Sequence, residues 1–200
     1  SGNRSELNRV DGPAGEAVFV NVRVMVISPD GTWLYVIDGT SVRRVSTADG
    51  SVVTIAWDGL LEGANYGQPV TMAIDPSGSN LYVAAETSCC GPDTADIVRV
   101  PASGGSAVLV VAGARNSSAV SISPDGQYIY YSGKPPPEEC PSDLSKCGAH
   151  LRRLPISGGD AMAGEDLGGG ASFQENVRDL ARGPDGRLDG VRDHRRAGDG

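Results

Sequence analysis

The 200-residue chain is 39% hydrophobic and 21% charged, which is typical of a globular protein with one sizeable core. Its net charge of −8 argues against a nucleic-acid partner, because binding to phosphates requires a positive surface. No stretch reaches the roughly 20 apolar residues of a membrane span. The chain begins at Ser1 without a signal-peptide pattern, as expected of a mature product or an excised piece.

A four-residue turn recurs along the chain. It reads SPDG, DPSG, SPDG and GPDG, and its prolines are Pro29, Pro76, Pro124 and Pro184. In such turns proline sets a φ near −65°, Asp or Ser caps backbone N–H groups, and glycine takes a positive φ. The first two spacings are 47 and 48 residues and the third is 60. A period in the forties is typical of a four-stranded propeller blade.

The residues around each turn alternate in the manner of β-strands. In the first unit we expect strands at residues 22–28, 33–38, 42–46 and 52–56, with the turn between the first two. Later units repeat this order, although the fourth strand of the third unit, DAMAGEDL, is weak. Because one such sheet cannot bury both of its faces, the units are expected to stack on one another.

The stretch VDGPAGEAVFVNVRVMVISPDGTWLYVIDGTSVRRVSTADG, residues 10–50, resembles a blade of the NHL-repeat β-propellers and their YVTN and SMP-30-like relatives. The resemblance extends over about residues 10 to 175. It implies an all-β fold, namely a β-propeller fragment built of four-stranded antiparallel blades. It implies little about function, because propellers of this class include enzymes, sensors and scaffolds.

We divide the chain into an N-terminal segment, three blades and a remainder, at residues 1–21, 22–60, 61–113, 114–168 and 169–200. The last range is a partial fourth blade and a tail that we expect to be poorly ordered, because LDGVRD replaces the expected second strand. The N-terminal segment is too polar to replace a sheet over blade 1. We therefore expect the open sheet faces to need further blades or another chain.

The four cysteines lie in polar, turn-rich stretches and favour disulfides over a zinc site. Cys140–Cys147 with a vicinal Cys89–Cys90 bridge is one connectivity, and two bridges between blades 2 and 3, which avoid vicinal strain, are the other. Glycosylation sequons at Asn3 and Asn116 agree with an oxidising compartment. The sequence therefore predicts an extracellular or cell-surface location.

The loops that leave each second strand, together with those between blades, define a candidate binding face. Its acidic and aromatic members are Asp38, Asp58, Glu62, Tyr66, Glu86, Asp93, Asp96, Glu165 and Asp166. Carboxylates suit Ca²⁺, but no ligand spacing is diagnostic, and a solvated acidic rim is the simpler interpretation. We predict no other cofactor.

No catalytic motif surrounds either histidine, His150 or His194. The sequence therefore favours a non-enzymatic binding or assembly module of a secreted or cell-surface protein, acting through the loop face. The alternative is a metal-dependent hydrolase or lyase of the SMP-30-like class, as the resemblance implies. The expected partner is a protein, a glycan, or further blades of the same parent chain.

Overall fold

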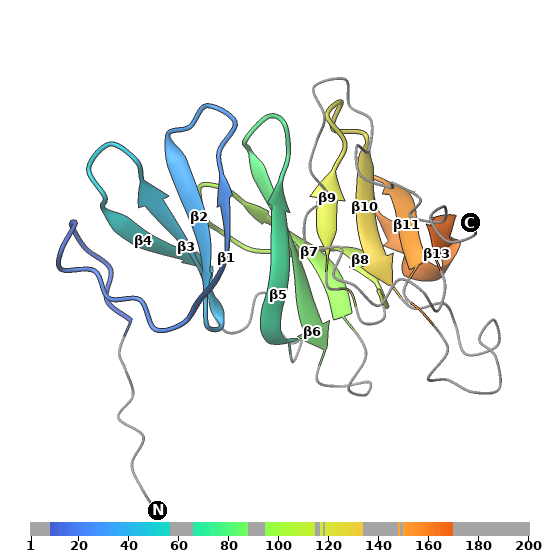
Figure 1. The fold of residues 1–200 in the computed structure, drawn as a ribbon, viewed down its shortest axis with the longest axis horizontal. Coiled ribbons are helices and arrows are strands. Elements are labelled where there is room, and N and C mark those ends of the chain that lie inside the picture. The colour runs from blue at the N-terminus through green and yellow to red at the C-terminus, as the bar shows by residue number, and fades with distance from the viewer. Residues whose placement is uncertain are drawn as a thin grey trace, which may run out of the picture.

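The computed structural model describes residues 9–56, 66–87, 95–114, 117, 119–133, 148 and 150–169, which form three sheets side by side (Figure 1). Each sheet has a four-stranded antiparallel core, so the predicted all-β class is confirmed. Across the described ranges the single helical element is a three-residue 3-10 turn, η3 (Ala161–Ala163). No described helix is long and apolar enough to cross a membrane.

Blade 1 contains β1 (Val22–Ile27), β2 (Trp33–Asp38), β3 (Ser41–Ser46) and β4 (Val52–Ala56), paired in that order. These bounds agree with the predicted strands to within one residue. The agreement arises because the β1–β2 turn is fixed locally: the Asp30 carboxylate accepts hydrogen bonds from Ser28 and Thr32 within the turn itself.

Blade 2 contains β5 (Tyr66–Ile74), β6 (Asn80–Thr87), β7 (Ala95–Pro101) and β8 (Val108–Ala112). Its β5–β6 pairing is irregular on both sides of Pro69, a residue that cannot donate to the ladder. Blade 3 contains β9 (Val120–Ile122), β10 (Tyr128–Gly133), β11 (His150–Pro155) and β13 (Glu165–Gly169).

The weak fourth strand of blade 3 is split in two. Its first part, β12 (Gly159–Asp160), leaves blade 3 and pairs in parallel with β8 of blade 2. The carbonyl oxygen of Ala161 then accepts hydrogen bonds from the Tyr131 hydroxyl at 2.7 Å and from Arg152 at 3.4 Å. Burial raises the pKa of Tyr131 to about 12, so its hydroxyl remains a donor at neutral pH. This segment therefore links blades 2 and 3.

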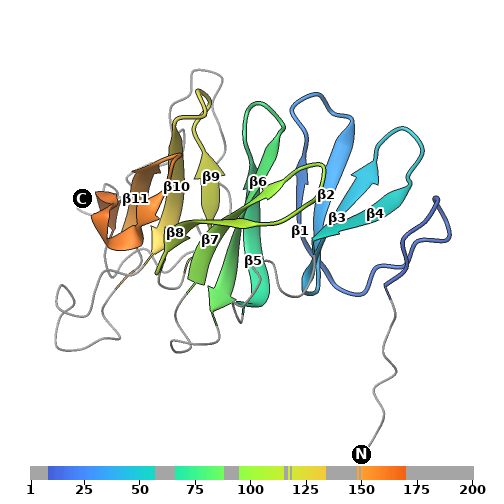
Figure 2. The same cartoon turned by 180° about the vertical axis from the view of Figure 1, so that it is seen from behind.

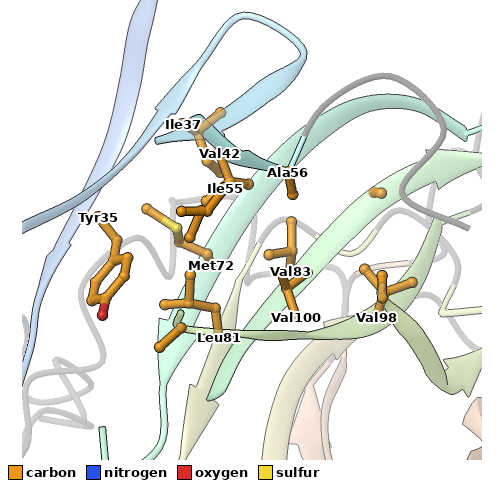
Figure 3. Packing of buried hydrophobic residues seen from close by; sticks show 13 residues of the cluster. Tyr35, Ile37, Val42, Ile55, Ala56, Met72, Leu81, Val83, Val98 and Val100 are labelled. Atoms are coloured by element: carbon orange, nitrogen blue, oxygen red, sulfur yellow. The ribbon is translucent and has the colours of Figure 1, made fainter. Parts of the chain in front are cut away.

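The core consists of two apolar layers, one on each face of blade 2. The view from behind shows blade 2 between blades 1 and 3 (Figure 2). Leu81 and Val83 of β6 face blade 1, and Tyr82 and Ala84 face blade 3, as strand alternation requires. In the first layer, Tyr35 and Ile55 of blade 1 approach Met72, Leu81 and Val83 of blade 2 (Figure 3). Each blade thus buries a face only where another blade lies beside it.

The link between blades 2 and 3 can be tested at Gly158, where φ is +84° and an added Cβ would lie 1.9 Å from the carbonyl oxygen of Val110. We expect Gly158→Ala to lower the free energy of unfolding by about 2 kcal/mol more than Gly113→Ala does. Gly113 is a matched control, because its φ is +72° and an added Cβ meets no atom within 4 Å. Equal losses in urea denaturation would contradict the close approach of this segment to β8.

Candidate functional site

The face of blade 1 that points away from blade 2 is the candidate site, and we call it the open face. Strand register places two rows of side chains on it. One row runs Met25, Val36, Arg43 and Thr54, and the other runs Ile27, Leu34, Val45 and Val52. The alternate positions, such as Tyr35 and Ile37, belong to the core layer shared with blade 2.

Arg43 is the centre of the open face and its side chain is fully buried. Nη1 lies 3.0 Å from a carboxylate oxygen of Asp38, which is also fully buried, and donates to the Val18 carbonyl at 2.6 Å. Nη2 donates to the Val10 carbonyl at 2.6 Å and to Asp11 at 2.9 Å. One arginine therefore ties β2 to two points of the N-terminal segment.

The same cluster contains further contacts that hold this segment. The Phe19 ring centroid lies 4.5 Å from Cζ of Arg43, within the range of a cation–π contact. Burial alone would raise the pKa of Asp11, but hydrogen bonds from Thr54 and Arg43 and the arginine charge outweigh it and lower the pKa. Asp11 therefore stays ionised at neutral pH and keeps its ion pair with Arg43.

Residues 9–20 cover the outer half of the open face. Gly12 forms a β-bridge with Val52 of β4, and a second bridge joins Val10 to Val18 within the segment. Our expectation that the N-terminal segment is too polar to cover blade 1 is therefore wrong for this half. The segment needs little apolar surface, because Arg43 donates to its carbonyl groups and Thr54 donates to its Asp11 carboxylate.

The inner half of the open face is uncovered. Met25 is 60% exposed and Ile27 is 56% exposed, and the neighbouring Phe19, Val20 and Val22 are also exposed. We call these five residues the apolar strip. Five large apolar side chains exposed within residues 19–27 are typical of an interaction site.

Several predicted loop-face residues lie elsewhere than expected. Asp38 does not lie on a solvated surface, since it is fully buried against Arg43 and accepts hydrogen bonds from the backbone of Val20 and Asn21. Asp96 accepts from the Gly113 backbone N–H at 2.7 Å, and Glu86 is exposed at the end of β6. Tyr66 begins β5. Aligning the repeats could have revealed the buried arginine. It places Arg43 at the position of Val98, an apolar residue that is buried in blade 2.

Glu165 and Asp166 are engaged within blade 3. Glu165 forms a salt bridge with Arg153, and Asp166 lies 2.6 Å from Nδ1 of His150. The other predicted positions lie outside the described residues: Asp58, Glu62, Asp93, the cysteines Cys89, Cys90, Cys140 and Cys147, the sequon residues Asn3 and Asn116, and His194. Disulfide connectivity, glycosylation and the loop face at large therefore stay predictions.

The described residues offer little for metal or acid–base chemistry. Among them, no three His, Cys, Asp or Glu side chains gather closely enough to hold a metal ion. His150 and Asp166 form a histidine–carboxylate pair like two members of a catalytic triad, but no catalytic sequence motif surrounds them. What the described geometry can do is bind another apolar surface at the strip.

Comparison with known proteins supports the fold class. No protein-family model and no curated protein matches the chain. An auxiliary nutrient binding protein from Bacteroides thetaiotaomicron is 12% identical over 81% of this chain, with a TM-score of 0.55. The tricorn protease is 13% identical over 70% of the chain at 0.51, and a prolyl endopeptidase is 13% identical over 75% at 0.50.

The chain spans 34% of the first of these structures, 14% of the second and 22% of the third. At such low identity the likeness concerns the fold alone. The structural neighbours have β-propeller-type folds, and the chain, with its consecutive four-stranded antiparallel sheets, has the same type of fold.

The Arg43–Asp38 pair can be tested by comparison with blade 2, where Val98 and Ala85 hold the corresponding register positions. Arg43→Val alone leaves a buried carboxylate without a cation and should cost about 3–5 kcal/mol of unfolding free energy. The double variant Arg43→Val/Asp38→Ala copies the pair of blade 2 and should be more stable than Arg43→Val alone. Urea denaturation of both single variants and the double variant measures this coupling. Purely additive losses would show that the two charges do not depend on each other.

Proposed function

We propose that this chain is a non-enzymatic binding or assembly module of a secreted or cell-surface protein, built on a propeller of the NHL-like class. The observation that carries the proposal is the apolar strip, Phe19, Val20, Val22, Met25 and Ile27. A second protein surface, either a partner or further blades, would cover this strip. The loop face is the second surface that we assign to binding, through loops outside the described residues.

The energetic argument rests on the two most exposed side chains. Fully burying one Met or Ile side chain contributes about 1.5–3 kcal/mol. Met25 and Ile27 are both more than half exposed, so covering them would recover on the order of 2–3 kcal/mol. Association carries its own entropic cost, so a partner would have to cover more than these two residues. The other three residues of the strip provide that additional area.

Chemistry also favours binding over catalysis at this face. The charged groups of the open face, Arg43 and Asp38, are paired and fully buried, and Asp11 completes the set. Groups so engaged are poor general acids or bases, because any change of charge would leave a partner uncompensated in a buried setting. An apolar strip beside a neutralised ion cluster suits a protein surface better than a polar substrate.

The proposal predicts that the chain self-associates or aggregates at micromolar concentration, because the strip finds other apolar surfaces. Met25→Glu/Ile27→Glu should shift it toward the monomer in multi-angle light scattering. Both positions are exposed, so the charges can be hydrated and the fold should survive. Circular dichroism and thermal melting of the variant check that the sheets are retained.

Val53→Glu/Val108→Glu is the matched control. These two valines are also exposed, at 48% and 49%, but they lie on the outer strands β4 and β8, away from the strip. We expect the control variant to associate as the unmodified chain does. A monodisperse, cooperatively melting monomer for the unmodified chain would refute the proposal, as would equal effects of the two double variants.

A further inference from the structure

We infer that a further propeller blade packs on the apolar strip. The first strand of that blade presents apolar β-branched side chains at alternate positions, as Val24 and Val26 do in β1. This inference rests on the proposed function and names the partner that it requires. It is carried by three independent features: the internal equivalents of Met25 and Ile27, the placement of the N-terminal segment, and the absence of an uncompensated charge on the described part of the open face.

In blades 2 and 3, the residues equivalent to Met25 and Ile27 are covered by the preceding blade. Met25 lies opposite Val36 in register, as Met72 lies opposite Val83 and Val120 lies opposite Tyr131. Met72 is only 3% exposed and Val120 is 8% exposed, against 60% for Met25. The same contrast holds in the second row, where Ile122 is 1% exposed and Ile27 is 56% exposed.

The residues that cover Met72 define the chemistry of the missing occupant. Met72 belongs to a core layer with Tyr35, Ile37 and Ile55 of blade 1, and Val24 and Val26 of β1 pack against the same layer. Figure 3 shows Met72 between Ile55 of blade 1 and Leu81 of blade 2. Since blades 1 and 2 carry the same Met and Ile at the same register, the same kind of surface fits both.

The N-terminal segment occupies the place of an outer strand only. In blade 2, the turn between the third and fourth strands approaches Ile55 of β4 through Gly104, and in blade 3 the same turn approaches Val110 of β8 through Gly158. In blade 1 the corresponding Gly50 approaches Ala14 of the N-terminal segment. At Ala14 the segment therefore takes the place of the outer strand of a preceding blade, while Gly12 pairs with the edge of β4. The place of the inner strands, above Met25 and Ile27, is left to another sheet.

The electrostatics of the face agree with an apolar sheet as occupant. Arg43 is compensated by Asp38 and Asp11 and is shielded by Phe19. The charges of these groups are balanced within the chain, so the partner needs to supply shape and apolar area rather than counter-charge. A blade meets both conditions, because its own backbone hydrogen bonds are already made within its sheet.

A duplicated chain tests the inference in cis. The repeat spacing of 47 residues makes Phe19 equivalent to Tyr66, so residues 1–65 can be placed directly ahead of residue 19 of the chain. The following copy also carries Arg43→Val/Asp38→Ala, because the fusion removes the Val10, Asp11 and Val18 groups that Arg43 contacts, and blade 2 has valine and alanine at these positions. The leading copy then offers its Val24 and Val26 to Met25 of the following copy. A thiol introduced by Met25→Cys in the following copy is labelled with maleimide and located by peptide mass spectrometry.

We expect labelling of that thiol to be lost in the duplicated chain and to be rapid in the 200-residue chain carrying the same substitution. Both are measured at nanomolar concentration, where light scattering establishes which species is present. Met72→Cys in the duplicated chain is the control for folding and should be protected. Val24→Glu/Val26→Glu in the leading copy should restore labelling of the following copy while leaving Met72→Cys protected.

Two results would overturn the inference. One is rapid labelling at Met25→Cys in a duplicated chain whose Met72→Cys control is protected. The other is a discrete dimer of the 200-residue chain, stable at nanomolar concentration, in which the thiol at Met25→Cys is already protected, because the occupant would then be a second copy. In the second case binding at the strip, as proposed for the chain, would stand, and only the identity of the occupant would be wrong.

Discussion

The structure depends on one constraint, which is that a four-stranded sheet with apolar side chains on both faces must be covered on both. Blade 2 satisfies it completely, with Val83 and Leu81 against blade 1 and Ile97 and Tyr82 against blade 3. Each of these four residues is 2% exposed or less. Blade 1 satisfies it on one face by a sheet and on the other by an irregular segment that covers only half. Within the described residues of blade 1, the apolar strip is thus where the constraint is unmet, which suits it to an interaction.

The features of the fold that could be predicted from the sequence are those determined by contacts between residues close together in the chain. The SPDG and DPSG turns close on themselves through Ser28, Asp75 and Ser123, whose partners lie within five residues. Strand bounds follow from those turns and from period-two alternation, and for blade 1 they match to one residue. Repetition then implied stacking, because a lone sheet of this composition would expose both faces. The predicted propeller class needed no long-range information.

The parts that sequence reasoning missed are those in which partners are distant or irregular. The Arg43 contacts with Val10, Asp11 and Val18 span 25 to 33 residues, and nothing local marks those carbonyls as acceptors. Asp38 is the last residue of its strand and precedes a glycine, which is typical of a solvated turn carboxylate, so the sequence assigns it to the acidic loop face. β12 crosses to blade 2 over a two-residue pairing that no periodicity encodes. In each case tertiary contact overrides a correct local preference.

The position of Arg43 also explains why a buried charge is found in this otherwise apolar architecture. The register that places Arg43 opposite Val36 places Val98 opposite Val83 in blade 2 and Arg152 opposite Tyr131 in blade 3. Val98 faces the finished sheet of blade 1, whose backbone groups are already paired within its own ladder. Arg43 faces the N-terminal segment and donates to its carbonyls at Val10 and Val18, while Arg152 donates to the carbonyl of Ala161 in the irregular link to β8.

An irregular segment brings acceptors that lack partners, and leaving such an acceptor buried and unsatisfied costs about 1–3 kcal/mol. Arginine, with five donors on a long apolar stem, satisfies several of them from one strand position. The residue at this register therefore follows from what covers it: valine where the cover is a sheet, and arginine where the cover is irregular backbone.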